Sequence, residues 1–231
     1  MKLKIFSLAL CLGMVLASCN NMQKGAGIGA VGGAVLGGIV GKIAGNTVVG
    51  AAVGGAVGAG AGALIGKHMD KVKAEAEAVR NAEVQEVTDA NGLQAVKLTF
   101  DSGILFATGK STLTAASKQS LNELAAVLKR NADCDVAVQG YTDNVGFKGK
   151  TAEQSVELNK ALSLDRAAAV SSYLQSLGVN AAQIKDVQGF GQDNPVASND
   201  TEAGRKQNRR VEIYMYASQD MINAAEAGTL Q

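Results

Sequence analysis

Residues 136–170 constrain the fold of the chain most, because they pass from a strand pattern to a helix pattern within a short distance. Val136 and Val138 alternate with other residues up to Gly140, as the buried side of a short strand does. A polar loop follows. The helical stretch after it carries four residues spaced three, four and seven apart, which therefore share one face: Asn159, Leu162, Ser163 and Arg166. The pattern predicts a strand–loop–helix unit that can bring polar groups together.

Two charged residues of this unit, Asp143 in the loop and Arg166 on the helix, allow two interpretations. An acid and an arginine are the groups needed to hold an amino acid by its ammonium and its carboxylate. The alternative is a structural ion pair between the two residues, and spacing alone favours it. The residues by themselves therefore indicate either a two-point clamp for a zwitterionic ligand or an internal salt bridge.

Three ordered motifs in the same part of the chain carry a resemblance to a known family: GYTDN at 140–144, NKALSLDRA at 159–167 and QNRRVEIY at 207–214. Together they resemble the OmpA-like C-terminal domain over about residues 98–216, more than half of the chain. The resemblance implies a domain that binds the peptide stem of peptidoglycan. It also implies an α+β fold, in which helices cover one face of a mixed sheet of four to five strands.

The resemblance further implies which residues hold the ligand. In the family, an Asp and an Arg at the positions of Asp143 and Arg166 clasp the diaminopimelate of the stem peptide. The other expected ligand-binding residues hold supporting positions or belong to the same motifs: Thr142, Asn159, Leu162 and Arg209.

This sequence departs from the family pattern in two places. Sixteen positions separate Asp143 from Asn159, more than is usual in the family. The longer loop is expected beside the ligand, and it contains Phe147, Lys148 and Lys150. In a turn that lines the peptide site in the family, Ala107 and Gly109 replace an Asp and an Asn, so some contacts are expected to be missing.

The first 18 residues have the pattern of a secretory signal. Lys2 and Lys4 precede an apolar run at 5–16, which is too short to span a membrane as a helix. The run ends in LASC at 16–19, which resembles a bacterial lipobox and implies that Cys19 is lipidated, with 19–24 as a tether. The alternative is an ordinary signal with a stray cysteine. The resemblances imply lipid anchoring at the outer membrane, with the globular domain in the periplasm.

Residues 25–66 form a glycine ladder, in which eleven glycines recur every four residues with one shift of register between Gly45 and Gly50. The ladder predicts two helices joined by a turn, a glycine-zipper hairpin. Glycine costs a helix about 1 kcal/mol per residue, so such helices need a partner packed closely against the bare stripe. A homo-oligomer is therefore a further expectation. A flexible linker is the alternative, and whether the hairpin enters the membrane stays open.

The cysteines leave no pair for a disulfide, because Cys11 lies in the signal and Cys19 is the expected lipidation site. Cys134 is predicted to be an inert buried thiol, since the single histidine, His68, lies far away in the sequence. His68 is expected at the surface. With no second histidine, the sequence predicts neither a metal site nor a cofactor.

The remaining segments surround or form the globular domain. Residues 67–82 carry charges of alternating sign at helical spacing and predict a solvated helical spacer. Residues 83–218 form the domain, with strand and helix patterns in the order ββαβαββ. Its first helix is expected to be capped by Ser111 or Thr112, and its second covers 152–177 with a break near Ser163. Residues 219–231 are expected to be a loose tail.

Two further patterns indicate other chemistry only weakly. The stretch from Gly103 to Ser111 resembles a phosphate-binding loop, but five residues separate its glycines where the motif has four. Asp143 and Asp165 could suggest glycan hydrolysis, but no second acid shares the loop of Asp143, so the chain is not expected to be an enzyme. A net charge of +1 gives no indication of a nucleic-acid partner.

The leading hypothesis is a lipid-anchored outer-membrane protein that binds the peptide stem of peptidoglycan non-covalently and tethers the membrane to the wall. The alternative is a structural or assembly lipoprotein that oligomerises through its glycine zipper, with wall binding secondary. The sequence does not separate these two hypotheses.

Overall fold

The computed structural model describes residues 57–230, except 90, 91 and 108. The expected signal at 1–18, Cys19 and the tether at 19–24 lie outside the described residues, as does the glycine ladder up to residue 56. Among the described residues, no helix combines the length and the apolar character needed to cross a membrane.

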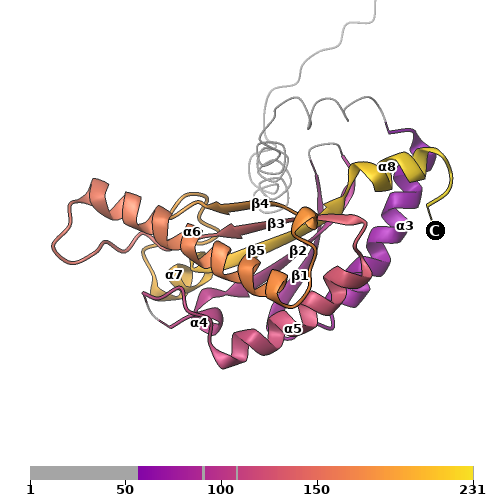
Figure 1. The fold of residues 1–231 in the computed structure, drawn as a ribbon. Helices are drawn as coiled ribbons and strands as arrows, with labels where there is room; N and C mark the ends of the chain where they lie inside the picture. The colour runs from indigo at the N-terminus through magenta and orange to yellow at the C-terminus, as the bar shows by residue number, and fades with distance from the viewer. Residues whose placement is uncertain (1–56, 90–91, 108, 231) are drawn as a thin grey trace, which may run out of the picture.

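Five strands form one mixed sheet in the order β1-β2-β5-β3-β4 (Figure 1). β5 pairs antiparallel with both β2 and β3, and β1 pairs antiparallel with β2 as the predicted hairpin. β3 and β4 run parallel, so they need a crossover, which helix α6 supplies. The bounds are β1 Ala82–Thr88, β2 Gln94–Asp101, β3 Cys134–Gly140, α6 Ala152–Ser176, β4 Ile184–Gly189 and β5 Arg210–Ala217.

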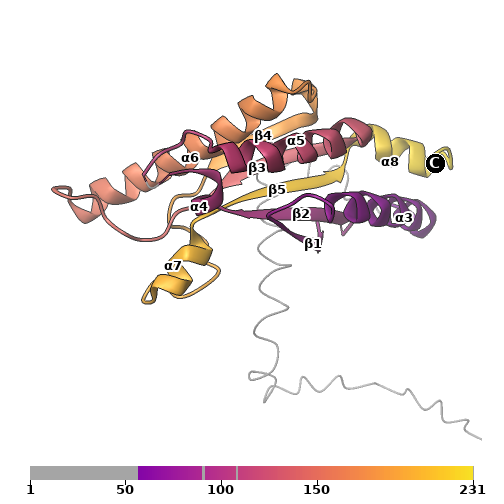
Figure 2. The same cartoon turned by 90° about the horizontal axis from the view of Figure 1, so that it is seen from below.

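The main core lies between one face of this sheet and the helices. Along β5, Val211, Ile213 and Met215 alternate with other residues and are fully buried in the main core. Figure 2 shows α5 and α6 along the same side of the sheet, which confirms the predicted α+β arrangement. The other helices are α3 Ala59–Ala76, α4 Ser102–Leu105, α5 Ala115–Arg130, the short 3-10 helix Ala181–Gln183, α7 Glu202–Asn208 and α8 Gln219–Glu226.

Helix α3 corrects the expectation of a solvated spacer at 67–82. Its apolar residues recur at helical spacing and are fully buried in the main core: Ile65, Met69, Val72 and Ala76. The charged residues that suggested a spacer, such as Asp70, lie on the outer face of the same helix. The helix begins at Ala59, inside the ladder. Apart from the chain neighbours of Gly62 and the backbone of its own helix, no described atom lies within 4 Å of where a Cβ on Gly62 would stand.

The C-terminal segment also differs from the expected loose tail, because it forms helix α8. The helix begins after Ser218, whose hydroxyl accepts a hydrogen bond from the Met221 N–H at 3.1 Å. Met221, Ile222 and Ala225 are buried in the main core, and α8 lies against α3. The segment is short and rich in alanine, so its apolar face was a weak signal in the sequence.

Helix α6 is continuous, which corrects the expected break near Ser163. The Ser163 hydroxyl donates to the Lys160 carbonyl at 2.8 Å and accepts from the Gly191 N–H at 2.8 Å, so its polar group is satisfied without a break in the helix. Helix α5 begins later than expected, because Thr114 is its cap rather than Ser111 or Thr112.

Glycines at the ends of β3 and β4 allow α6 to approach the sheet backbone to backbone. A Cβ on Gly140 would stand 2.0 Å from the Ser163 carbonyl oxygen, and one on Gly189 would stand 2.2 Å from the Leu164 nitrogen. Gly191 has a φ of +58°, and a Cβ there would stand 2.9 Å from the Lys160 nitrogen. Gly189 and Gly191 therefore allow the close packing of α6 against the end of β4.

Gly140→Ala should destabilise the domain, because the added methyl group meets a backbone oxygen that cannot rotate away. Overpacking of this kind costs about 1–3 kcal/mol, which corresponds to roughly 2–4 °C of melting temperature per kcal/mol for a chain of about 150–250 residues. Thermal unfolding measures the effect. The matched control is Gly62→Ala in α3, which should leave stability unchanged or raise it by up to about 1 kcal/mol. Equal melting temperatures for Gly140→Ala and wild type would contradict the packing argument.

Candidate functional site

A cavity of about 550 Å³ lies beyond the C-terminal end of β3. Its wall is formed by the loop after β3, the middle of α6, the α4 region and the α7 region. All six residues expected to hold a ligand line this cavity: Thr142, Asp143, Asn159, Leu162, Arg166 and Arg209. Residues that the sequence did not single out as ligand contacts also line it, among them Ser102, Phe106, Val145 and Glu202.

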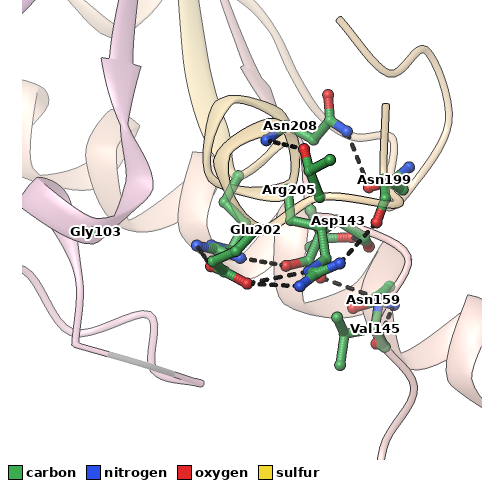
Figure 3. A network of polar contacts seen from close by, with 12 residues as sticks. Gly103, Asp143, Val145, Asn159, Asn199, Glu202, Arg205 and Asn208 are labelled. Carbon is green, nitrogen blue, oxygen red and sulfur yellow. Dashed lines mark hydrogen bonds and ion pairs between the residues drawn. The ribbon is translucent and has the colours of Figure 1, made fainter. Parts of the chain in front are cut away.

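Asp143 is held in place by its neighbours (Figure 3). Its Oδ1 accepts the Val145 N–H at 3.1 Å, and its Oδ2 lies 2.6 Å from Arg209 Nη1. The side chain is 10% exposed, so the carboxylate is nearly buried but still faces the cavity. Asp143 and Arg166 do not form the alternative structural ion pair, because no such pair occurs among the ion pairs of the described residues. The direct partner of Asp143 is Arg209.

Arg209 connects two carboxylates. Its Nη1 binds Asp143, and its Nη2 lies 2.7 Å from Oε1 of Glu202. Burial works to lower the pKa of Arg209, but the hydrogen bonds to Asp143 and Glu202 outweigh it and raise that pKa. For Glu202, hydrogen bonds from Arg209 and then Arg205 lower the pKa. This bridge places two acids on one side of the cavity around a shared cation.

Helix α7 and the loop before it place this bridge. Thr201 caps the helix by accepting the Gly204 N–H, so Glu202 is its first residue and Arg209 follows its end. The Asn208 side chain donates a hydrogen bond to the Ala197 carbonyl and accepts one from the Ala197 N–H. It also donates to the Asn199 side chain (Figure 3). These contacts fix the loop from which α7 starts.

Arg166 differs from Arg209 because none of the described carboxylates lies within ion-pair distance of it. The residue is 5% exposed, donates from Nε to the Lys110 carbonyl at 3.1 Å and has its guanidinium 5.3 Å from the centre of the Phe106 ring. Burial lowers the pKa of Arg166, the Asp143 charge opposes that effect and the Arg209 charge adds to it. A buried cation without a direct counter-ion is costly for the folded state. The charge of Arg166 is therefore not compensated by an ion pair within the described part of the chain.

The longer loop after Asp143 is pinned to α6 by two side chains. Asn159 Nδ2 donates to the Val145 carbonyl at 3.1 Å, and the Ser155 hydroxyl accepts the Phe147 N–H at 3.1 Å. Val145 and Phe147 thereby line the cavity, whereas Lys148 and Lys150 of the same loop are not among its lining residues. Thr142 acts locally, because its hydroxyl donates to the Asp143 carbonyl at 2.9 Å.

A larger hollow of about 930 Å³ lies on the face of the sheet that points away from the main core. None of the six expected residues lines it. Its charged wall includes Arg210 and Glu212, whose side chains are each 5% exposed and joined at 2.8 Å. Burial works to raise the pKa of Glu212, but the Arg210 charge and the Tyr214 hydroxyl outweigh it and lower that pKa. This pair satisfies itself, so it needs no partner from outside.

The domain thus combines a mixed sheet with a cavity that is lined by two oppositely charged residues, Asp143 and Arg166. Residues 105–209 match the model of the OmpA family, and residues 1–70 match the YMGG-like Gly-zipper. The chain therefore carries an OmpA-family domain and a Gly-zipper segment, as the motifs indicated. OmpA-like domains form a structural, non-enzymatic family, which agrees with the expectation of no enzymatic activity for this domain.

Curated relatives resemble parts of the chain. The "Peptidoglycan-binding protein ArfA" of Mycobacterium tuberculosis is 42% identical over 110 residues, which are 48% of this chain and 31% of ArfA. The "Outer-membrane lipoprotein YfiB" of Pseudomonas aeruginosa is 36% identical over 116 residues, 50% of this chain and 64% of YfiB. The chain thus spans less than two thirds of either relative.

A solved structure shares the fold, and it is described as the cell wall anchor of the T6SS from Pseudomonas aeruginosa. It is 25% identical in sequence, the match covers 65% of this chain and 97% of that structure, and the TM-score is 0.51. The shared fold agrees with the OmpA-family assignment.

Removing the charge of Arg166, which has no ion-pair partner among the described residues, should change the stability of the domain little. Arg166→Met keeps much of the side-chain volume and removes a buried charge, so the free energy of unfolding should stay within about 1 kcal/mol of wild type or rise. The matched control, Arg210→Met, leaves Glu212 buried without its partner and should lose about 3–5 kcal/mol. Denaturant unfolding measures both variants. Equal, large losses would show that Arg166 is a structural residue.

Proposed function

We propose that the cavity binds the peptide stem of peptidoglycan, with Arg166 receiving a carboxylate and Asp143 an ammonium group of diaminopimelate. The observation that carries the proposal is the buried Arg166, which has no carboxylate partner among the described residues and lines the same cavity as Asp143. The planar guanidinium suits a carboxylate, and a ligand carboxylate would supply the missing counter-charge.

Asp143 can accept an ammonium group although it already binds Arg209. An ionised carboxylate offers about four lone-pair sites, and each of its oxygens accepts one hydrogen bond from the protein. Arg209 then acts as a positioning residue, whose hydrogen bond fixes the orientation of the Asp143 carboxylate. The cavity volume of about 550 Å³ falls within the range of roughly 300–1,000 Å³ usual for small-ligand sites.

The names of the relatives support the same function. ArfA is named as peptidoglycan-binding and YfiB as an outer-membrane lipoprotein. We extend both properties to this chain: its domain holds the wall, and a lipid on Cys19 holds the outer membrane. The protein then tethers the membrane to the wall without a covalent bond to peptidoglycan.

The wall-binding proposal is tested with the full chain in detergent and purified sacculi. Charged hydrogen bonds are worth about 1.5–3 kcal/mol each, so Arg166→Ala and Asp143→Asn should each weaken binding roughly 10- to 100-fold. Arg166→Lys keeps the charge but loses the planar fork, and should fall between wild type and Arg166→Ala. A co-sedimentation isotherm gives the dissociation constants.

The matched control is Arg130→Ala, which removes an exposed guanidinium that pairs with Glu75 and does not line the cavity. It should bind sacculi like wild type, and free diaminopimelate should compete with wild-type binding. If folded Arg166→Ala and Asp143→Asn proteins both bind at wild-type strength, the clamp is wrong.

The anchoring proposal is tested separately in cells. Cys19→Ala removes the thiol that would carry the lipid, so the precursor should stay uncleaved by the lipoprotein peptidase and should not take up labelled palmitate. Cys11→Ala is the matched control and should be processed and labelled normally. Persistent palmitate labelling of the Cys19→Ala protein would exclude this residue as the anchor and leave the wall-binding proposal untouched.

A further inference from the structure

Three side chains with metal-binding donor atoms converge at the opposite end of β3 from the ligand cavity. His68 comes from α3, while Asp133 and Cys134 stand at the start of β3. One donor atom from each lies within 4.8 Å of the other two. No pattern in the sequence indicates this group, because His68 and Cys134 are 66 positions apart and α3 was expected to be solvated.

His68 is the least satisfied member of the group. Its side chain is 11% exposed, which corrects the expected surface position. Both ring nitrogens are buried and have no hydrogen-bond partner within the described part of the chain. Nε2 lies 3.3 Å from Oδ2 of Asp133, but the two groups are not in hydrogen-bond geometry. Buried imidazole nitrogens normally have a hydrogen-bond partner or a metal ion, so a bonding partner for this ring would stabilise it.

Cys134 and Asp133 complete a set of nitrogen, oxygen and sulfur donors. The Cys134 thiol is fully buried, as predicted, and lies 4.0 Å from the Met69 sulfur. Burial raises the pKa of the Cys134 thiol, and the charges of Asp133 and then Asp135 raise it further. The Asp133 side chain is 40% exposed and gives an ion and a water molecule a path from solvent.

We propose that His68, Asp133 and Cys134 bind one Zn²⁺ ion, which joins helix α3 to the first residues of β3. Zinc accepts imidazole, carboxylate and thiolate together, usually in a tetrahedron that water can complete. Bonds of about 2.0–2.3 Å separate tetrahedral ligands by roughly 3.3–3.8 Å. The 3.3 Å between His68 and Asp133 fits that spacing, and donors within 4.8 Å of one another need a shift of about 1 Å to reach it.

The donor set argues against other common ions. Ca²⁺ and Mg²⁺ take oxygen donors and have no use for the thiol or the imidazole. Cu⁺ favours soft sulfur donors, so it would recruit Met69 in place of the carboxylate. When Zn²⁺ binds, a sulfur–zinc bond replaces the S–H bond of Cys134 and the proton leaves to water. The site differs in place and chemistry from the cavity that we propose for peptidoglycan.

The test uses the full chain in detergent with Cys11→Ser and Cys19→Ser, so that Cys134 is the sole thiol. After chelator treatment, Zn²⁺ is titrated in competition with a chromophoric chelator, and Co²⁺ is substituted to reveal thiolate ligation by its charge-transfer band. We expect one ion per chain, a thiolate–cobalt band, and a higher melting temperature with Zn²⁺.

Three variants of this parent remove one ligand each: His68→Gln, Asp133→Asn and Cys134→Ala. Each should lower Zn²⁺ affinity by more than the roughly 10–100-fold that loss of an outer-shell partner costs. The matched controls are Asp135→Asn, which removes the neighbouring carboxylate paired with Lys185, and Met69→Leu, and both should bind Zn²⁺ like the parent.

Sacculus binding provides the independent readout. His68→Gln should keep parental binding, because the metal group and the cavity lie at opposite ends of β3. The proposal is overturned if the parent binds Zn²⁺ no more tightly than the three variants, if the Co²⁺ form lacks the thiolate band, or if Met69→Leu loses affinity while Asp133→Asn does not. None of these results depends on whether peptidoglycan is the ligand of the cavity.

Discussion

Helix α6 lies against the sheet backbone to backbone, with Gly140 and Gly189 where side chains would otherwise hold the two apart. Asp143 follows Gly140 by three residues, and Arg166 follows Ser163 by three. The contact therefore sets the separation between the acid and the guanidinium in the walls of the cavity. A helix displaced by the width of a methyl group would change that separation, so the geometry of the site depends on two glycines that do not line the cavity.

Three arginines of the domain differ in their burial and in the carboxylates that neutralise them. Arg210 is buried beside Glu212 and is neutralised within the protein. Arg209 is partly exposed and is shared between Asp143 and Glu202, so it orders acids at the cavity. Arg166 is about as buried as Arg210 but lacks such a carboxylate among the described residues. This unequal compensation of charge is the reason why we propose Arg166, rather than Arg209 or Arg210, as the partner of a ligand carboxylate.

The sequence predicted what local pattern and motif can specify. The sheet, its two long helices and the gathering of six residues around one cavity were all foreseen. The contacts within that cavity were not, because the pairing of Asp143 with Arg209 depends on where α7 starts. The role of α3 was hidden because its charges are more conspicuous in sequence than its evenly spaced apolar residues. His68 and Cys134 lie far apart in the sequence and come together only when α3 packs against the sheet. No local sequence pattern could therefore predict that they are neighbours.

The burial of α3 has a mechanical consequence. This helix is the first described element, so any tension that reaches the domain from the N-terminal side acts first on a helix in the core, and no slack spacer at 67–76 absorbs it. Peeling α3 away would expose Ile65, Met69 and Val72 to water and would also remove the support of α8. Load is thus resisted by the hydrophobic packing of α3, close to the point where it enters the domain.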